Sequence, residues 1–193
     1  MKFLEDDALV SARRLLGARL RRGSVAVEIT EVEAYLGEDD PASHAWKGPS
    51  KRNLVMFGPP AHLYCYTMHG HTCCNVVCSA EGLASAVLIR AGRVVEGIDD
   101  ARSRRPGVPD ERLARGPGNL TKALGITMVD AGASLFDEAS SVRLTPGRTH
   151  VDVSSGPRVG VSRAADVPWR FWVTGDPTVS AYRRAKAAGT ART

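Results

Sequence analysis

The chain has 193 residues and a mass of 20.6 kDa, and its 26 Lys+Arg against 21 Asp+Glu give a formal net charge of +5. We expect a single domain over residues 1–193, because a chain of this length can bury about 70% of its unfolded surface without metals or disulfides. With 43% hydrophobic and 24% charged residues the composition is globular. No apolar run approaches the ~18 residues of a membrane span, which excludes a membrane-spanning protein.

The charged residues also bear on location and partner. Glu5, Asp6 and Asp7 interrupt the N-terminal segment where a cleaved leader needs an apolar core, so we expect a cytoplasmic protein. Most of the basic residues are arginines, whose planar guanidinium suits bidentate recognition of phosphate. This bias is compatible with a nucleic-acid partner and equally with a base composition that favours arginine codons.

The N-terminal part of the chain predicts a helix, a strand and a long loop. Apolar residues recur at helical spacing from Leu9 to Leu20 behind two acidic residues, which predicts a helix over residues 6–20. Residues 25–35 are rich in β-branched side chains and alternate in polarity, which predicts a strand. The following segment, GEDDPASHAWKGPSKRNLVMFGPP, is typical of a long ordered binding loop.

The rest of the chain predicts a hairpin, more strands and two helices. Runs at 62–67 and 71–79 flank the turn Met68-His69-Gly70, which is typical of a β-hairpin. The other predicted elements are a strand at 84–91, a helix near 93–104, a basic loop at 105–119, a helix at 120–124 ended by Gly125, and short strands at 150–154, 158–162 and 169–174.

A cluster of cysteines and histidines raises the question of a zinc site. Its members are Cys65, Cys73, Cys74 and Cys78, with His69 and His71 among them. Structural zinc sites prefer cysteine pairs separated by about two to four residues, whereas Cys73 and Cys74 are adjacent and point to opposite faces of a strand. We therefore expect small apolar thiols packed in a sheet, with neither a metal site nor a disulfide framework.

Two polar faces carry aromatic residues. Strand alternation places Glu31, Glu33 and Tyr35 on one face, where a carboxylate beside a ring could provide a general base next to a stacking surface. From spacing alone, a solvated strand face is the more ordinary explanation. Tyr64 and Tyr66 share a face of the predicted hairpin in the same way. Two such faces separated by a Gly/Pro loop are what a base-stacking pocket requires.

The most specific feature is a series of eight ordered motifs between about residue 3 and residue 180. They are E-V-E-A-Y-L-G (31–37), D-P-A-S-H-A (40–45), S-K-R-N-L-V-M-F-G-P-P (50–60), H-L-Y-C-Y (62–66), C-x-N-V-V (73–77), V-L-I-R-A (87–91), G-P-G-N-L-x-x-A-L-G-I (116–126), and P-R-V-G-V (157–161) with P-W-R-F-W (168–172). In this order they resemble the alkyladenine (3-methyladenine) DNA glycosylase family. The resemblance, and not the composition, points to a named reaction.

The resemblance implies a mixed α/β (α+β) fold, with a curved, mainly antiparallel sheet, flanking helices and a β-hairpin that enters the DNA minor groove. It also implies an enzyme of base excision repair that flips alkylated or deaminated purines out of duplex DNA and hydrolyses the N-glycosidic bond. A cationic base such as 3-methyladenine is already a good leaving group, so one carboxylate can suffice. No motif positions Lys47 or Lys51 for a lyase step, so we expect a monofunctional enzyme that leaves an abasic site.

The resemblance assigns roles to the polar faces and the loop. Glu33 matches the general base that activates the attacking water. Tyr35, His44 and Tyr66 match side chains that stack on or hydrogen-bond to the flipped base. These residues would form the base pocket.

Three further residues match positions of known role, and the hairpin departs from the family pattern. Asn75 matches the residue whose bulk opposes the exocyclic amino group of normal guanine, and Arg90 matches a residue near the phosphate and the catalytic water. His69 stands where the minor-groove wedge is usually tyrosine, and it fills less space than a phenol. The hairpin is also one residue shorter before C-x-N, and Ala61 stands where glycine is usual.

From these matches we expect double-stranded DNA with damaged purines as the partner, a monomeric protein associated with the nucleoid, and neither cofactor nor metal. A second hypothesis is a module that binds distorted DNA without cleaving it, for which the altered hairpin is the motivating feature. A third, a zinc-dependent module built on the cysteine cluster, is disfavoured by the cysteine spacing.

Overall fold

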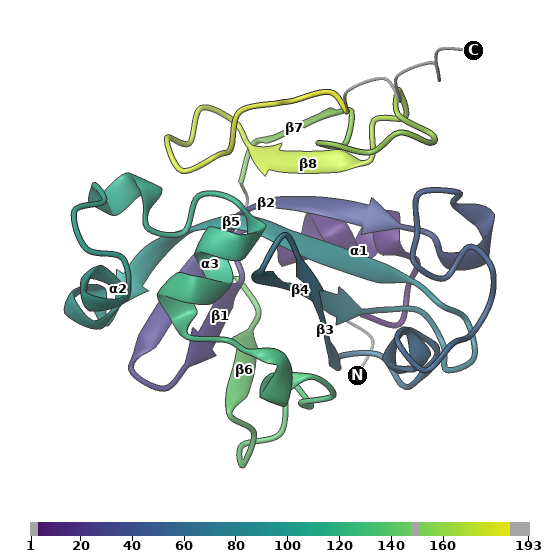
Figure 1. The fold of residues 1–193 in the computed structure, drawn as a ribbon, viewed down its shortest axis with the longest axis horizontal. Coiled ribbons are helices and arrows are strands. Elements are labelled where there is room, and N and C mark those ends of the chain that lie inside the picture. The colour runs from purple at the N-terminus through teal and green to yellow at the C-terminus, as the bar shows by residue number, and fades with distance from the viewer. Residues whose placement is uncertain (1–3, 148–150, 186–193) are drawn as a thin grey trace, which may run out of the picture.

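The computed structural model describes residues 4–147 and 151–185, which form a mixed α/β fold around one curled antiparallel sheet (Figure 1). The strands are β1 (Arg19–Arg22), β2 (Val25–Tyr35), β3 (Leu63–Met68), β4 (His71–Val77), β5 (Ala86–Glu96), β6 (Val142–Thr145), β7 (Val153–Gly156) and β8 (Arg170–Val173). The helices are α1 (Ala8–Leu15), α2 (Ile98–Arg104) and α3 (Pro117–Leu124). The fold class predicted from the sequence is confirmed.

The long strand β2 lies at the centre of the sheet, whose order is β3-β4-β5-β2-β1-β6. One edge of β2 pairs with β5, while the other pairs with β1 over residues 25–28 and with β8 over residues 31–33. The pairing of β2 with β5 shifts register near Ala26, Ile29 and Glu31. Such bulges increase local twist, and here they accompany the curl of the sheet seen in Figure 1.

Two apolar clusters stabilise the fold. The larger one combines side chains such as Leu15 of α1, Ile89 of β5 and Leu120 of α3, all with no exposed surface. The smaller one is built on β3, β4 and β5 and contains Tyr64. Neighbouring residues of β3 alternate between the two, because Cys65 belongs to the larger cluster. The hairpin strands therefore have one face in the core and one face toward the smaller cluster.

The predicted helix over 6–20 is wrong in its second half. Helix α1 begins after Asp7, whose carboxylate accepts hydrogen bonds from two backbone N–H groups of the first turn, the nearer being Leu9 N at 2.8 Å. The helix ends at Leu15, because Gly17 takes a left-handed φ of 77° and the chain then enters β1. No helix in the described part of the chain is long and apolar enough to cross a membrane.

The predicted strand at 25–35 and the predicted hairpin are confirmed. The hairpin turn is the pair His69-Gly70, with φ of 50° and 77°, a combination that two-residue hairpin loops favour. The predicted strand at 84–91 continues to Glu96, so the helix predicted near 93–104 is wrong in its first part. Helix α2 begins only after Gly97, whose φ is 68°. The sheet pairing with β2 extends this strand beyond its local pattern.

The elements predicted after residue 119 are confirmed in part. The helix predicted at 120–124 begins earlier, at Pro117, and ends before Gly125 as expected. The strand at 169–174 is confirmed as β8. The strand at 158–162 is wrong, because this segment forms turns rather than pairing. The predicted strand at 150–154 starts at a residue outside those described, and β7 begins at Val153. No local pattern predicts β1 and β6, each four residues long.

Candidate active site

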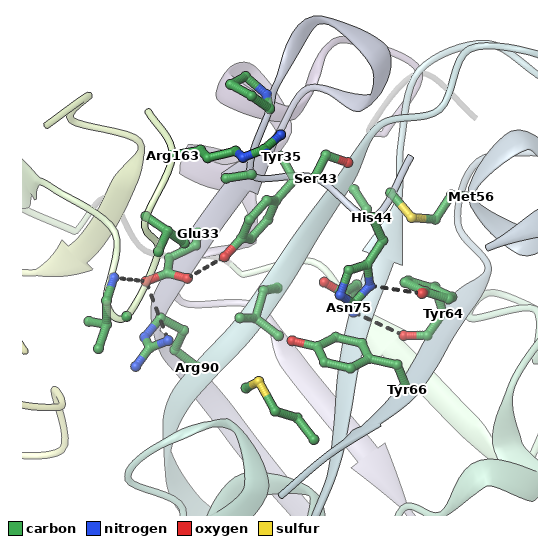
Figure 2. Close-up of a pocket in the computed structure, with 18 of the residues that line it drawn as sticks. Glu33, Tyr35, Ser43, His44, Met56, Tyr64, Tyr66, Asn75, Arg90 and Arg163 are labelled. Carbon is green, nitrogen blue, oxygen red and sulfur yellow. Dashed lines mark hydrogen bonds and ion pairs between the residues drawn. The ribbon is translucent and has the colours of Figure 1, made fainter. Parts of the chain in front are cut away.

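A cavity of about 370 Å³ opens beside β2 and the hairpin (Figure 2). Its wall is formed by the end of β2, by β3, β4 and β5, and by two loops, residues 41–44 and 159–163. The cavity is lined by Glu33, Tyr35, His44, Tyr66, Asn75 and Arg90, all proposed from the sequence, and also by Tyr64, Met56, Met68 and Arg163. With Met56, which belongs to the short helical turn Leu54–Phe57, residues from seven separate segments converge on this cavity.

Among the residues that the structure describes, Glu33 is the only carboxylate that lines this cavity, and its side chain has no exposed surface. Three groups hold its carboxylate. The backbone N–H of Val159 donates to Oε1 at 2.7 Å, the hydroxyl of Tyr35 donates to Oε2 at 2.9 Å, and Nη1 of Arg90 lies 3.3 Å from Oε1. The two hydrogen bonds and the ion pair with Arg90 fix the carboxylate in one orientation at the cavity wall (Figure 2).

Glu31 is equally buried but does not line the cavity. Its Oε1 accepts hydrogen bonds from Nε of Arg90 at 3.0 Å and from Nη1 of Arg170 at 3.1 Å. The backbone N–H of Ser180 donates to Oε2 of Glu31 at 2.7 Å, and the hydroxyl of Ser180 donates to Oε1 at 2.9 Å. Alternation along β2 places Glu31 and Glu33 on the same face, as predicted. Their surroundings differ, because the Glu31 carboxylate is bound by protein groups away from the cavity, whereas the Glu33 carboxylate lines the cavity.

Arg90 on β5 connects these two carboxylates. Its side chain is 8% exposed and lies within ion-pair distance of both Glu31 and Glu33. Burial lowers the pKa of Arg90, but the charges of Glu33 and Glu31 outweigh this effect, and the net result is a pKa above the ordinary value. Arg90 is therefore a permanent cation beside the cavity carboxylate.

Aromatic rings form the opposite wall. His44 lies edge-on to Tyr66, with ring centroids 4.5 Å apart and an interplanar angle of 83°, and its Nδ1 lies 3.0 Å from the hydroxyl of Tyr64. Partial burial, together with the charge of Arg52, lowers the pKa of His44. Burial raises the pKa of Tyr66 far above its ordinary value. The wall is therefore made of neutral rings at neutral pH.

Asn75 lies on β4 directly opposite Tyr64 of β3. Its side-chain amide donates a 3.1 Å hydrogen bond to the backbone oxygen of Tyr64, and the residue is 4% exposed. This bond locks the side chain against the hairpin backbone. Asn75 thus occupies a fixed volume at the base of the cavity.

Comparison with known proteins identifies the family of the chain. The model of the family described as Methylpurine-DNA glycosylase (MPG) matches residues 2–177. The chain belongs to the methylpurine-DNA glycosylase family. This confirms the resemblance, and it places the chain among the DNA-repair hydrolases that cleave N-glycosyl bonds.

Three bacterial relatives of this glycosylase are similar over nearly their whole length. A protein of Nocardia farcinica is 53% identical over 196 residues, which cover 97% of this chain and 92% of the relative. A protein of Cutibacterium acnes is 50% identical, with 93% and 98% covered. A protein of Mycobacterium tuberculosis is 52% identical, with 96% and 94% covered. All three are named, provisionally, as 3-methyladenine DNA glycosylases.

The hairpin tip of this glycosylase projects beside the cavity. His69 is exposed at the turn, while its neighbour Met68 is 44% exposed and contributes to the cavity lining. His71, across the turn, packs toward α3, where a Cβ on Gly118 would come within 2.8 Å of the Cβ of His71. The tip is thus braced on one side by a helix. Entry of His69 into DNA stays a prediction.

The four cysteines of the glycosylase are buried free thiols. Cys74 belongs to the larger apolar cluster and Cys73 to the smaller one, so the adjacent pair faces opposite sides, as expected. Burial raises the pKa of Cys65 and of Cys78 to about 12. Within residues 4–147 and 151–185, no group of three or more His, Cys, Asp and Glu side chains could hold a metal ion.

Sequence reasoning missed several residues of the site. The sequence pattern places Tyr64 on one face with Tyr66 but gives it no role in the pocket, and the motif that contains Val159 gives that residue no role. Arg158, inside the same motif, is fully buried against Asp40. At the cavity mouth the guanidinium of Arg163 lies over the ring of Trp46, 4.5 Å from its centroid. The motif P-R-V-G-V was the one available signal for Arg158 and Val159.

Proposed function

We propose that this chain is a monofunctional DNA glycosylase that flips alkylated or deaminated purines of the 3-methyladenine type out of duplex DNA. In this proposal the flipped base occupies the 370 Å³ cavity and Glu33 activates the water that cleaves the N-glycosidic bond. The observation that carries the proposal is the cavity carboxylate of Glu33, which is held by two hydrogen bonds and an ion pair and faces a wall of aromatic rings.

The proposed chemistry is a hydrolytic displacement at the sugar. Water attacks C1′ of the flipped nucleotide, the N-glycosidic electron pair leaves with the purine, and Glu33 accepts the proton that the water loses. Because Tyr35, Val159 and Arg90 already stabilise the carboxylate, Glu33 is best suited to orient the water and to stabilise positive charge on the sugar. Departure of the base leaves an abasic site.

The ring wall suits the leaving group. A purine methylated at N3 or N7 carries a positive charge, which is attracted to the faces of tyrosine rings. Tyr35, His44 and Tyr66 would hold such a base, and the fixed side chain of Asn75 would oppose the exocyclic amino group of normal guanine. Damaged bases also cost less to unstack, which adds selectivity before the base reaches the cavity.

In the same proposal the hairpin fills the space that the flipped nucleotide leaves. His69 stands at the tip, and its imidazole can stack between bases. The protein would act as a monomer on double-stranded DNA, with Arg90 near the phosphate and the catalytic water. No cofactor is required, because water is the nucleophile. An alkylated, cationic purine leaves as a neutral base, whereas hypoxanthine must gain a proton from solvent as it leaves.

A second candidate function is recognition of distorted DNA without cleavage. The small His69 side chain and the short hairpin turn favour it, because weaker insertion would lower the population of the flipped state. Both candidates share the same DNA-binding surface. They differ only in whether the base is released.

Release of free base separates the two candidates. The wild-type protein is incubated with four duplexes containing 3-methyladenine, 7-methylguanine, hypoxanthine or 1,N6-ethenoadenine, and free base is measured by chromatography. We expect release from at least one duplex, with strands that stay intact until alkali treatment. Lesion binding with no release over hours supports the binding module, and strand cleavage without alkali contradicts the monofunctional assignment.

A further inference from the structure

A fully buried ion pair lies directly behind the cavity. The side chains of Arg158 and Asp40 both have no exposed surface. Nη2 of Arg158 donates to Oδ1 of Asp40 at 2.9 Å, and Nη1 donates to Oδ2, so the contact is bidentate. Nη1 also donates to the backbone oxygen of Ala34 at 3.0 Å. This pair lies outside the residues that line the cavity.

The guanidinium of Arg158 also lies between two aromatic rings. Its Cζ is 4.6 Å from the ring centroid of Tyr35 and 5.0 Å from that of Trp169. Tyr35 is the residue whose hydroxyl binds Glu33. The position of this ring, and with it the donor to the cavity carboxylate, therefore depends on the cation packed against it.

The ion pair joins three chain segments that supply the site. Arg158 directly precedes Val159, whose backbone N–H binds Glu33 at 2.7 Å. Asp40 opens the turn that leads to His44, since its carboxylate accepts from Ala42 N at 3.0 Å and its backbone oxygen accepts from Ser43 N at 2.8 Å. Through Ala34 the same pair is tied to β2 between Glu33 and Tyr35.

Stability alone does not account for this arrangement. A buried ion pair is often no more stabilising than apolar side chains of the same volume, because both charges lose their hydration. Nε of Arg158 is in addition buried with no hydrogen-bond partner, which costs further free energy. The pair does supply a fixed geometry. The planar guanidinium of Arg158 makes five contacts, which reach β2, Asp40 and Trp169.

We propose that Arg158 and Asp40 are positioning residues of the reaction, which hold the Val159 N–H and the Tyr35 hydroxyl in register with the Glu33 carboxylate. This inference rests on the proposed function of Glu33. Misplacement of a reacting group by ~1 Å can cost about 100-fold in rate. Loss of the pair is therefore expected to lower the rate of the chemical step more than the affinity for lesion DNA.

The test uses two variants and a matched control. Asp40→Asn keeps the shape of the side chain and removes its charge, and Arg158→Lys keeps the charge and removes the planar fork. The control is Asp130→Asn, because Asp130 is another carboxylate with 2% side-chain exposure that is paired with an arginine, Arg22, but does not line or back the cavity. All are compared with wild type as full-length chains at a temperature below every unfolding midpoint.

The readout is single-turnover base release from whichever of the four lesion duplexes the wild type excises fastest, measured at increasing enzyme concentration. This dependence separates the maximal rate from the enzyme concentration at half-maximal rate. We expect Asp40→Asn and Arg158→Lys to lower the maximal rate at least about tenfold with the half-maximal concentration within about threefold. Asp130→Asn is expected to lower the unfolding midpoint and to leave the maximal rate within about twofold.

Each other outcome contradicts the inference in its own way. A folded Asp40→Asn or Arg158→Lys variant with wild-type maximal rate shows that the pair does not position the site. Failure of both variants to fold makes the pair an element of stability. An inactive wild type on all four lesion duplexes contradicts the proposed function itself, whereas an active wild type with unaffected variants contradicts the positioning role alone.

Discussion

The hydroxyl of Tyr35 donates a 2.9 Å hydrogen bond to Oε2 of Glu33, two residues earlier on the same strand. Burial and the neighbouring charge of Glu33 hold the pKa of Tyr35 well above its ordinary value. The phenol therefore stays protonated, and a hydrogen-bond donor, at neutral pH. The residue thus combines a ring at the cavity wall with a donor to the carboxylate.

Replacement of Tyr35 by phenylalanine separates these two properties. Tyr35→Phe keeps the ring and removes the hydrogen bond, and a bond to a charged group contributes about 1.5–3 kcal/mol, or about tenfold to 100-fold in rate. We expect single-turnover base release to fall within that range while lesion binding is retained. An unchanged rate would show that the phenol does not orient Glu33.

The lowered pKa of His44 predicts a pH dependence of stability. Partial burial and the charge of Arg52 lower the pKa of the folded state below the ordinary 6.5. As the pH falls through 6.5 the unfolded chain binds a proton that the folded chain does not, so the free energy of unfolding decreases. Thermal midpoints of wild type should therefore fall more steeply from about pH 7 to pH 5 than those of His44→Gln. The same dependence of the midpoint on pH in wild type and in His44→Gln would contradict this prediction.

Ala61 predicts a stabilising substitution. Its φ is 63°, a left-handed value that costs a non-glycine residue roughly 1–2 kcal/mol. Glycine adds about 0.5–1 kcal/mol of chain entropy loss. We therefore expect Ala61→Gly to raise the free energy of unfolding by about 0.5–1 kcal/mol in denaturant titrations. A decrease would mean that packing of the methyl group outweighs the strain.

Local patterns in the sequence predicted β2, the hairpin and β8, because alternation and turn residues act over a few positions. Local patterns did not predict the end of the first helix at Leu15, nor strands β1 and β6. Each of these strands has four residues and depends on pairing with strands that are distant in the sequence. Likewise, alternation could not tell Glu31 from Glu33. The groups that bind Glu31, Arg170 and Ser180, come from about 140 residues further along the chain, and only the tertiary fold brings them there.

The burial of the four cysteines predicts that their thiols react slowly in the native protein. With all four buried and the pKa of Cys65 and Cys78 raised to about 12, the thiolate fraction at neutral pH is small. A thiol-reactive dye should label none of them in the native protein within the time that labels all four after unfolding. Rapid labelling of the native protein, or one equivalent of zinc in the purified chain, would contradict the packing role.

The proposed mechanism depends on the carboxylate of Glu33. Replacement of Glu33 by a residue of the same shape without charge tests this mechanism most directly. Glu33→Gln keeps the side-chain volume and removes the charge, and Glu31→Gln is the matched control, a buried carboxylate bound to the same Arg90 but outside the cavity. We predict that Glu33→Gln, folded and still able to bind lesion duplex, loses at least about 100-fold in single-turnover base release, and that Glu31→Gln loses less. Wild-type release by a folded Glu33→Gln variant would contradict the proposed mechanism.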